Sequence, residues 1–131
     1  MEEKLLIEKA VEARKRAYAP YSGFPVGAAL LAKDGHVFTG CNVENASYGL
    51  TMCAERVALF KAVSEGVREF EAIAIACGEE PCPPCGACRQ VLFEFAQDLL
   101  LIMTDGEGKR VERVPLKEFL PRAFGPENLP P

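Results

Sequence analysis

The sequence predicts an α/β protein: a three-layer α/β/α sandwich in which helices cover both faces of a mixed sheet of about five strands. Two observations favour this class. Short apolar runs alternate with longer segments in which apolar residues recur at helical spacing. A helical segment also joins two of the apolar runs, and such a crossover requires its strands to pair in parallel. The 131 residues suffice for one ordinary core, so we expect a single domain over residues 1–131.

The first third of the chain predicts a helix followed by a hairpin. Apolar residues recur at helical spacing over about residues 2–17, and Pro20 then opens a loop. A strand is expected over 26–32 and a second over 37–43. The Asp-Gly pair within 33–36 suits the tight turn between them, because both residues tolerate positive φ. These two strands should therefore be antiparallel neighbours.

The rest of the chain alternates helix and strand. The run 72–76 is apolar throughout, which is typical of a central strand covered on both faces. The tail from Pro121 is rich in proline and is expected to be irregular. The expected elements are a helix over 52–65, a strand over 70–77, a helix beginning near Cys85, a strand over 99–103, an edge strand over 109–114, and a short helix over 115–120 with proline at its first position.

Charge and hydropathy exclude several classes of partner. The formal net charge is -4, and no cluster of Lys and Arg is interleaved with aromatic residues, so we expect no nucleic-acid partner. The densest basic run, 14–16, lies where the first helix should end, where cations are favourable. No apolar run reaches the length of a bilayer-spanning helix, so we expect no membrane partner. The acidic first residues do not resemble a signal peptide, which favours a cytoplasmic protein.

The chain contains six cysteines. In a reducing compartment these are expected to be core thiols, redox thiols or metal ligands, and not a disulfide framework. Cys41 and Cys77 fall in strand-like runs, where we expect small core residues.

The stretch CPPCGACRQ places three cysteines at steps of three. Cys85 and Cys88 should lie in the first turn of a helix on the same side, so both can bind one ion. Cys82 precedes two prolines and should point elsewhere. The spacing alone therefore leaves two candidate pairs, Cys82 with Cys85 and Cys85 with Cys88.

A second half of a metal site is expected at the start of the helix over 52–65. Cys53 is followed two residues later by Glu55, and a ligand and a free carboxylate could both reach one pocket from there. Three cysteines on zinc leave the fourth tetrahedral position for water, whose pKa the ion lowers. Three thiolates also leave a negative charge, which two helix N-termini and one or both of Arg56 and Arg89 could offset.

Simpler interpretations compete with this one. Cys82 could complete a closed, structural four-cysteine zinc site, or the C-x-x-C pairs could be redox thiols. Both leave Glu55 without a role. Taken singly, Glu55 could be an ordinary acid in a first helical turn, Asn42 and Glu44 a solvated strand edge, and Phe24 and Phe124 core residues.

A resemblance narrows these alternatives. Cys53-Ala54-Glu55 together with Pro84-Cys85-Gly86-Ala87-Cys88-Arg89-Gln90 resembles the signature of zinc nucleoside deaminases. The chain is similar almost end to end to the small homotetrameric cytidine deaminases. The further matching blocks are residues 19–29, 40–49 and 120–124.

The resemblance implies a cytidine deaminase-like fold and a hydrolase of pyrimidine salvage, which converts cytidine and 2′-deoxycytidine to uridine and 2′-deoxyuridine with release of ammonia. One Zn²⁺ per subunit would be held by Cys53, Cys85 and Cys88, with Cys82 outside the motif. Glu55 would carry protons to the pyrimidine N3 and to the leaving amine. The residues around the metal site would include Arg56, Arg89 and Gln90.

The resemblance also implies substrate contacts and an assembly. The substrate would be a small nucleoside, and the protein a homotetramer with sites shared between subunits. The contacts would be the backbone of Ala54 at the pyrimidine edge, Asn42 and Glu44 at the ribose 3′-hydroxyl, Phe24 and Phe124 of a neighbouring subunit on the base, and Tyr48 near a neighbour's site. The alternatives are deamination of another cytosine compound, such as a cytosine-containing antibiotic, and a non-catalytic zinc or thiol module.

Overall fold

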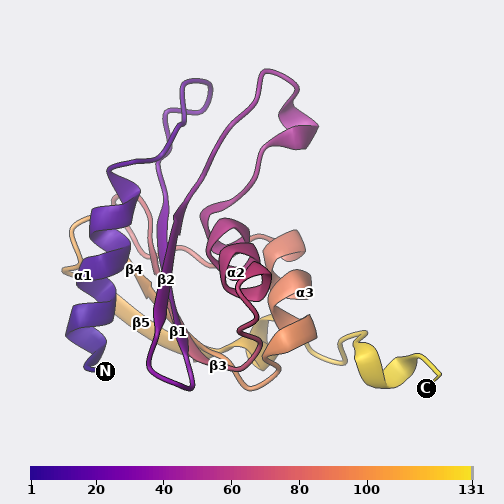
Figure 1. Ribbon diagram of the computed structural model, residues 1–131. Helices are drawn as coiled ribbons and strands as arrows, with labels where there is room; N and C mark the ends of the chain where they lie inside the picture. The colour runs from indigo at the N-terminus through magenta and orange to yellow at the C-terminus, as the bar shows by residue number, and fades with distance from the viewer. Residues whose placement is uncertain (131) are drawn as a thin grey trace.

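The computed structural model describes residues 1–130. A helix and a hairpin come first, and helices and strands then alternate (Figure 1). The helices and strands are α1 (Glu3–Arg14), β1 (Gly27–Ala32), β2 (Val37–Cys41), α2 (Ala54–Ser64), β3 (Phe70–Ala76), α3 (Gly86–Phe95), β4 (Leu100–Thr104) and β5 (Val111–Pro115), with short 3-10 turns η1 (Tyr48–Leu50), η2 (Leu116–Phe119) and η3 (Pro126–Asn128).

The five strands form one mixed sheet in the order β2-β1-β3-β4-β5. The pair β3 and β4, which α3 connects, is parallel, and the other neighbours are antiparallel. The hairpin turn between β1 and β2 has Gly35 at φ 97°, a conformation that favours glycine. The predicted mixed sheet, its parallel crossover and its first hairpin are therefore confirmed.

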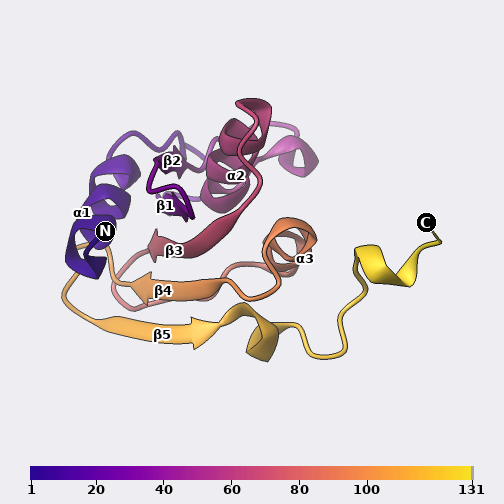
Figure 2. The same ribbon diagram turned by 60° about the horizontal axis from the view of Figure 1, so that its bottom comes forward.

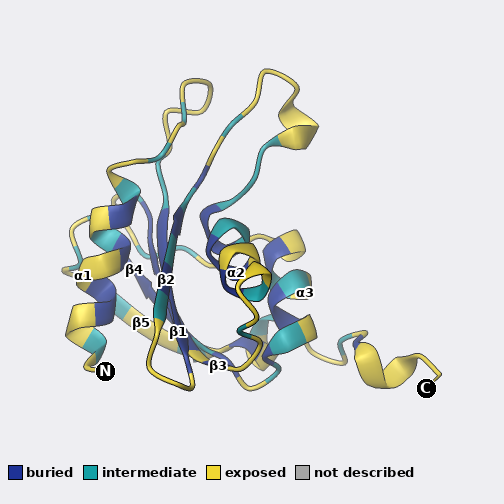
Figure 3. Ribbon diagram, viewed as in Figure 1, coloured by how far each residue is buried: buried dark blue, intermediate teal, exposed yellow. Residues whose placement is uncertain are grey.

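The helices lie on both faces of the sheet, as the α/β/α prediction requires. Figure 2 shows α1 on one face and α2 with α3 on the other. Every residue of β1 is buried, and its side chains alternate between two apolar clusters: Leu30 faces α2 and α3, whereas Leu31 faces α1. In Figure 3 the buried positions accordingly concentrate in the central strands and the inner helix faces.

Most predicted boundaries differ from the structure by one or two residues, and three differences have a clear physical cause. The first helix ends at Arg14 instead of residue 17, because Tyr18 already forms a parallel bridge opposite Val43, in which Tyr18 N donates to Asn42 O and Tyr18 O accepts from Glu44 N. Strand β2 ends at Cys41, and Val43 pairs with Met52 in an isolated bridge. The segment predicted as a helix from Pro115 is a single 3-10 turn, because Pro115 still pairs with Leu100 as the last residue of β5.

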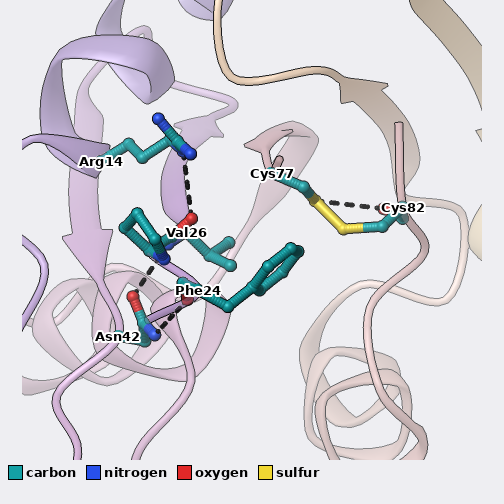
Figure 4. The surroundings of a disulfide bond; sticks show 7 residues. Arg14, Phe24, Val26, Asn42, Cys77 and Cys82 are labelled. Carbon is teal, nitrogen blue, oxygen red and sulfur yellow. Dashed lines mark hydrogen bonds between the residues drawn. A yellow bond between two sulfur atoms is a disulfide. The ribbon is translucent and has the colours of Figure 1, made fainter. Parts of the chain in front are cut away.

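The cysteines are not all free thiols, contrary to the expectation from composition. Cys77 and Cys82 form a disulfide, shown in Figure 4. The short loop after β3 turns back on itself and brings the two Cα atoms to 6.2 Å, within the usual range for a disulfide. Cys77 is buried but is not the core thiol that was predicted, and Cys41 is only half-buried at the end of β2. Among residues 1–130, no helix is long and apolar enough to span a bilayer.

Candidate active site

Two helix N-termini bring the predicted metal ligands together. Helices α2 and α3 lie side by side on one face of the sheet (Figure 1). Cys53 is the residue at the N-cap of α2, Cys85 is at the N-cap of α3, and Cys88 lies in the first turn of α3. The Sγ atoms of Cys53 and Cys85 are 3.8 Å apart, and those of Cys85 and Cys88 are 3.5 Å apart.

The spacing of the sulfurs fits a tetrahedral zinc ion. Zinc-sulfur bonds of about 2.3 Å at tetrahedral angles place neighbouring sulfurs about 3.8 Å apart. All three Sγ atoms lie within 4.8 Å of one another. Within residues 1–130 these cysteines are the one cluster with metal-ligand geometry.

The surroundings of the three cysteines stabilise negative charge on their sulfur atoms. The two helix N-termini carry partial positive charge, and Arg56 Nη2 donates to Cys53 Sγ at 3.4 Å. The pKa of Cys53 is lowered to about 5, first by a hydrogen bond from Cys88 and then by bonds from Arg56 and Cys85. The pKa of Cys88 is raised, because it donates to Cys53 and is buried.

The two arginines that sequence reasoning could not separate have different partners. Arg56 contacts a sulfur, as described above. Arg89 instead donates to the carbonyls of Pro84 at 2.8 Å and Phe119 at 3.3 Å, and its guanidinium lies 4.8 Å from the ring centroid of Phe119. Arg89 therefore fixes the loop that leads into Cys85.

Glu55 is a buried carboxyl beside this cluster. It is the second residue of α2, and only 5% of its surface is exposed. The pKa of Glu55 is raised to about 7: burial is the largest cause and the neighbouring charge of Cys53 adds to it, whereas the backbone amide of Glu55 and the charge of Arg56 act in the opposite direction. An ordinary first-turn acid is solvated and ionised, so this environment favours a group that takes up and releases a proton near neutral pH.

Cys82 does not take part in the cluster. Its sulfur is bonded to Cys77, so it forms neither a fourth ligand nor a redox pair with Cys85. The structure therefore contains neither the closed four-cysteine zinc site nor the Cys82–Cys85 redox pair, which were two of the competing interpretations.

Asn42 and Glu44, the predicted ribose contacts, both hold the loop between α1 and β1. The Asn42 side chain is buried; its Oδ1 accepts from Val26 N at 2.9 Å and its Nδ2 donates to Phe24 O at 3.0 Å (Figure 4). Glu44 Oε1 accepts from the amides of Tyr21 at 3.0 Å and Ser22 at 3.1 Å. The two side chains thus fix the backbone on either side of Gly23.

The predicted aromatic contacts are exposed. The ring of Phe24 is 47% exposed and points toward the Cys77–Cys82 disulfide (Figure 4), close to Gly78. Tyr48 is 74% exposed, and its ring centroid lies 5.9 Å from that of Tyr21. Phe124 is 59% exposed in the C-terminal tail, where Gln90 Nε2 donates to its carbonyl at 2.8 Å. Ala54, by contrast, is buried as the first residue of α2.

Comparison with known families agrees with this geometry. Residues 1–104 match the family described as the cytidine and deoxycytidylate deaminase zinc-binding region. The chain belongs to this family. The matched segment contains all three cysteines of the cluster and Glu55.

Relatives within the deaminase family match nearly the whole chain. A cytidine deaminase of Halalkalibacterium halodurans is 51% identical over 98% of this chain and 98% of its own length. One from Sporosarcina psychrophila is 48% identical over 98% of this chain and 96% of its own. The crystal structure of cytidine deaminase from Burkholderia pseudomallei, 52% identical, superposes with a TM-score of 0.91 over 95% of this chain and 100% of that one.

Three residues that were not predicted as substrate contacts, Tyr21, Ser22 and Thr51, lie beside two that were, Glu44 and Tyr48. A cavity of about 310 Å³ is lined by Tyr21, Ser22, Glu44, Tyr48 and Thr51. Tyr21 and Ser22 lie in the block 19–29 that resembles the deaminases, but no pattern in the sequence assigned either residue a role. Thr51 follows η1, and its Oγ1 accepts from Asn45 N at 3.1 Å. Only the folded loop reveals that these side chains share a cavity with Glu44.

Proposed function

We propose that this protein is a zinc-dependent cytidine deaminase of pyrimidine salvage. It hydrolyses cytidine and 2′-deoxycytidine to uridine and 2′-deoxyuridine, so that water replaces the exocyclic amine, which leaves as ammonia. The observation that carries the proposal is the pairing of three thiols at zinc spacing with a buried carboxyl two residues from one of them. Curated relatives named cytidine deaminase, 48% and 51% identical over nearly the full chain, support the same activity.

Cys53, Cys85 and Cys88 would hold one zinc ion per chain. When bound, zinc supplies a Lewis acid that lowers the pKa of water at its open position. The guanidinium of Arg56 and the helix N-termini offset the charge of the thiolates. Glu55 would take the two protons of the attacking water in turn and pass the first to N3 of the pyrimidine and the second to the departing amine. Its burial keeps bulk water away from this transfer.

The remaining roles concern substrate binding. The backbone of Ala54 and the Glu55 carboxyl contact the pyrimidine edge, and Phe24 packs on the base. Asn42 and Glu44 bind the ribose 3′-hydroxyl. Both side chains keep hydrogen-bonding capacity for this: Asn42 Nδ2 uses one of its two N–H groups on Phe24 O, and Glu44 has an acceptor position left.

The proposed assembly is a homotetramer with sites shared between subunits. The C-terminal tail and η3 extend away from the body of the chain (Figures 1 and 2), which supports a role outside their own subunit. Phe124 and Tyr48 are large apolar side chains exposed in such projecting segments, as is Leu50. In this proposal Phe124 packs on the base bound by a neighbouring subunit, and Tyr48 lies near a neighbour's site.

Two broader expectations are also proposals. Residues 1–131 are proposed to act as one catalytic domain, since all three cysteines, Glu55 and the nucleoside contacts come from one sheet and its connections. We also propose a cytoplasmic location: the three free thiols of the cluster fit a reducing compartment, although the Cys77–Cys82 disulfide does not.

The activity is tested by ammonia release from cytidine and 2′-deoxycytidine, with metal content measured on the same zinc-loaded sample. We expect about one zinc per chain, turnover of both nucleosides, and loss of turnover when a chelator removes the metal. Zinc-loaded protein that leaves both nucleosides unchanged would instead support a non-catalytic zinc module. Preferential turnover of a cytosine-containing antibiotic over cytidine would identify the runner-up substrate class.

A further inference from the structure

Ser22 has a hydroxyl group whose two hydrogen bonds have fixed directions. Phe24 N donates to Ser22 Oγ at 3.0 Å, so the oxygen is an acceptor there. Ser22 Oγ is also hydrogen-bonded to Glu44 Oε2, and the hydroxyl must be the donor because an ionised carboxylate has no proton. One side chain therefore connects the backbone of Phe24 to the carboxylate of Glu44.

The hydrogen bonds around Glu44 leave little freedom in its orientation. Each carboxylate oxygen can accept about two hydrogen bonds. Oε1 already accepts from the amides of Tyr21 and Ser22, and Oε2 accepts from the Ser22 hydroxyl. One acceptor position remains, on Oε2, and Glu44 lines the cavity together with Tyr21, Ser22, Tyr48 and Thr51.

The peptide units around Phe24 are held from both sides. Its amide donates to Ser22 Oγ, and its carbonyl accepts from Asn42 Nδ2. The exposed aromatic ring therefore projects from a backbone segment that is fixed at both polar groups, although the loop itself is on the surface. Among residues 1–130, Ser22 is the one side chain that hydrogen-bonds both to this segment and to Glu44.

We propose that Ser22 is a positioning residue for nucleoside recognition, which aims the free acceptor of Glu44 at a sugar hydroxyl and couples it to the position of the Phe24 ring. This inference rests on the proposed function, in which Glu44 binds the ribose and Phe24 the base. Neither hydrogen bond of the Ser22 hydroxyl goes to Glu55 or to a cysteine of the cluster. Its loss should therefore weaken substrate binding and leave the chemical step almost unchanged.

The first test compares Ser22→Ala with Ser22→Thr, which keeps a hydroxyl, and with Ser64→Ala as a matched control. Ser64 is an exposed serine at the end of α2 whose hydroxyl bonds only to Lys61 O. We expect Ser22→Ala to raise KM for cytidine roughly threefold to twentyfold with kcat within about twofold, because the hydroxyl loses its hydrogen bond to the Glu44 carboxylate and its bond from Phe24 N. Ser22→Thr should restore most of the affinity, and Ser64→Ala should behave as the unmodified protein.

The second test asks whether Ser22 acts through Glu44. In a double-mutant cycle with Glu44→Gln, the KM penalty of Ser22→Ala should largely disappear, because the carboxylate it orients is already gone. With 3′-deoxycytidine as substrate, Ser22→Ala should likewise cost much less than with cytidine. The zinc content of each variant should be unchanged, and its thermal midpoint should stay within about 3 °C.

The outcomes separate the inference from the proposed function. Three results would each overturn the inference and leave the proposed function intact. The KM penalties of Ser22→Ala and Glu44→Gln could multiply in the double variant, which would show that the two residues act independently. Ser22→Ala could lower kcat without changing KM, or it could fail to fold. Absence of turnover by the unmodified zinc-loaded protein would overturn the proposed function, and this inference with it.

Discussion

At the scale of single residues, burial gives Glu55 its chemical character. A carboxyl group on a residue that is only 5% exposed is harder to ionise, and its pKa is accordingly raised to about 7. It is therefore partly protonated at neutral pH, which suits a group that both accepts and donates a proton during one reaction. The sequence identified Glu55 through its spacing from Cys53, but it could not reveal this burial.

Glu55→Gln should keep zinc and lose nearly all turnover. The amide has almost the same shape and none of the cysteines is altered, so metal content should match that of the unmodified protein. An amide cannot take up and release the proton as the carboxyl group does, so kcat should fall by roughly 10² to 10⁴. Ammonia release and metal analysis on one sample check both parts. Normal turnover by Glu55→Gln would refute the assigned role.

The cysteines should separate into two classes when they are replaced. Cys85→Ala should abolish zinc binding, because it removes one of three ligands. Cys82→Ser should retain zinc, since its sulfur is bonded to Cys77 and not directed at the cluster. Loss of the disulfide should still lower stability, by about 2 kcal/mol for so short a loop.

Cys77→Ser is the matched control for that experiment, because it breaks the same bond from the other side. Both serine variants should show equal zinc content and similar shifts in thermal midpoint. An empty metal site in Cys82→Ser but not in Cys77→Ser would contradict the structure and revive the closed four-cysteine site.

The individual contacts around the cluster mark the limit of sequence reasoning at this scale. Ligand spacing and family resemblance suggested Cys53, Cys85 and Cys88, but not which arginine contacts a sulfur. That depends on the direction of each side chain: Arg56 reaches Cys53, whereas Arg89 is occupied by Pro84 and Phe119. The Cys77–Cys82 disulfide was missed because it depends on how a proline-rich loop returns to the strand end.

At the scale of the elements, the metal site depends on how closely α2 approaches the sheet. Gly40 in β2 lies directly under this helix: a Cβ atom there would come within 2.5 Å of Ala54 O and 2.6 Å of Ala58 N. Ala54 and Ala58 are themselves small and fully buried. Small residues on both sides thus let the first turn of α2, with Glu55, pack against the strand.

Gly40→Ala should therefore damage the site as well as the fold. The added methyl group must displace the backbone of α2, which costs about 1–3 kcal/mol and shifts Cys53 and Glu55 relative to α3. We expect a lower thermal midpoint together with weaker zinc affinity and lower kcat. Unfolding monitored by circular dichroism, zinc titration and ammonia release measure the three effects.

Gly27→Ala provides the control, because it creates the same kind of clash with a different helix. A Cβ atom at Gly27 would collide with the backbone of α1 at Ala10 and Arg14, on the opposite face of the sheet. This variant should lose stability to a similar degree but keep its zinc affinity. Equal loss of zinc in both variants would show that general destabilisation, and not the position of α2, controls the site.

Hydrophobic periodicity predicted the elements well and their ends less well. The apolar run within β3 and the spacing of α2 are local signals that the tertiary structure reinforces. Element ends depend on competing partners: Tyr18 pairs with Val43 and stops α1 from continuing, although residues 15–17 fit the helical pattern. Such long-range pairings are not visible in a local window.

At the scale of the whole molecule, several segments project from the α/β/α body. They are the connection from α1 to β1, the connection from β2 to α2 that includes η1, and the C-terminal tail with η3 (Figure 1). Each exposes large apolar side chains, among them Phe24, Tyr48 and Phe124. The topology of the body followed from the order of predicted elements, whereas no periodicity in the sequence indicated that these segments stand away from it.

If Phe124 completes the site of a neighbouring subunit, two defective chains should complement each other. Phe124→Ala retains Glu55, and Glu55→Gln retains Phe124. In mixed tetramers about a quarter of the sites combine both intact groups. Co-expression should therefore give more turnover than either variant alone, measured as ammonia release per zinc.

Co-expression of Cys85→Ala with Glu55→Gln is the control, because both residues serve the site of their own chain. This pair should show no recovery. Failure of the Phe124→Ala pair to recover activity, in a sample shown by light scattering to be mixed tetramer, would contradict the shared site.

The central claim is that three sulfurs bind the zinc and that its fourth position is open toward Glu55. X-ray absorption spectroscopy of the zinc-loaded protein tests this most directly, because it counts sulfur neighbours. We expect three sulfur atoms at about 2.3 Å from the zinc and one lighter atom at about 2.0 Å. Four sulfur neighbours around the zinc would contradict this claim.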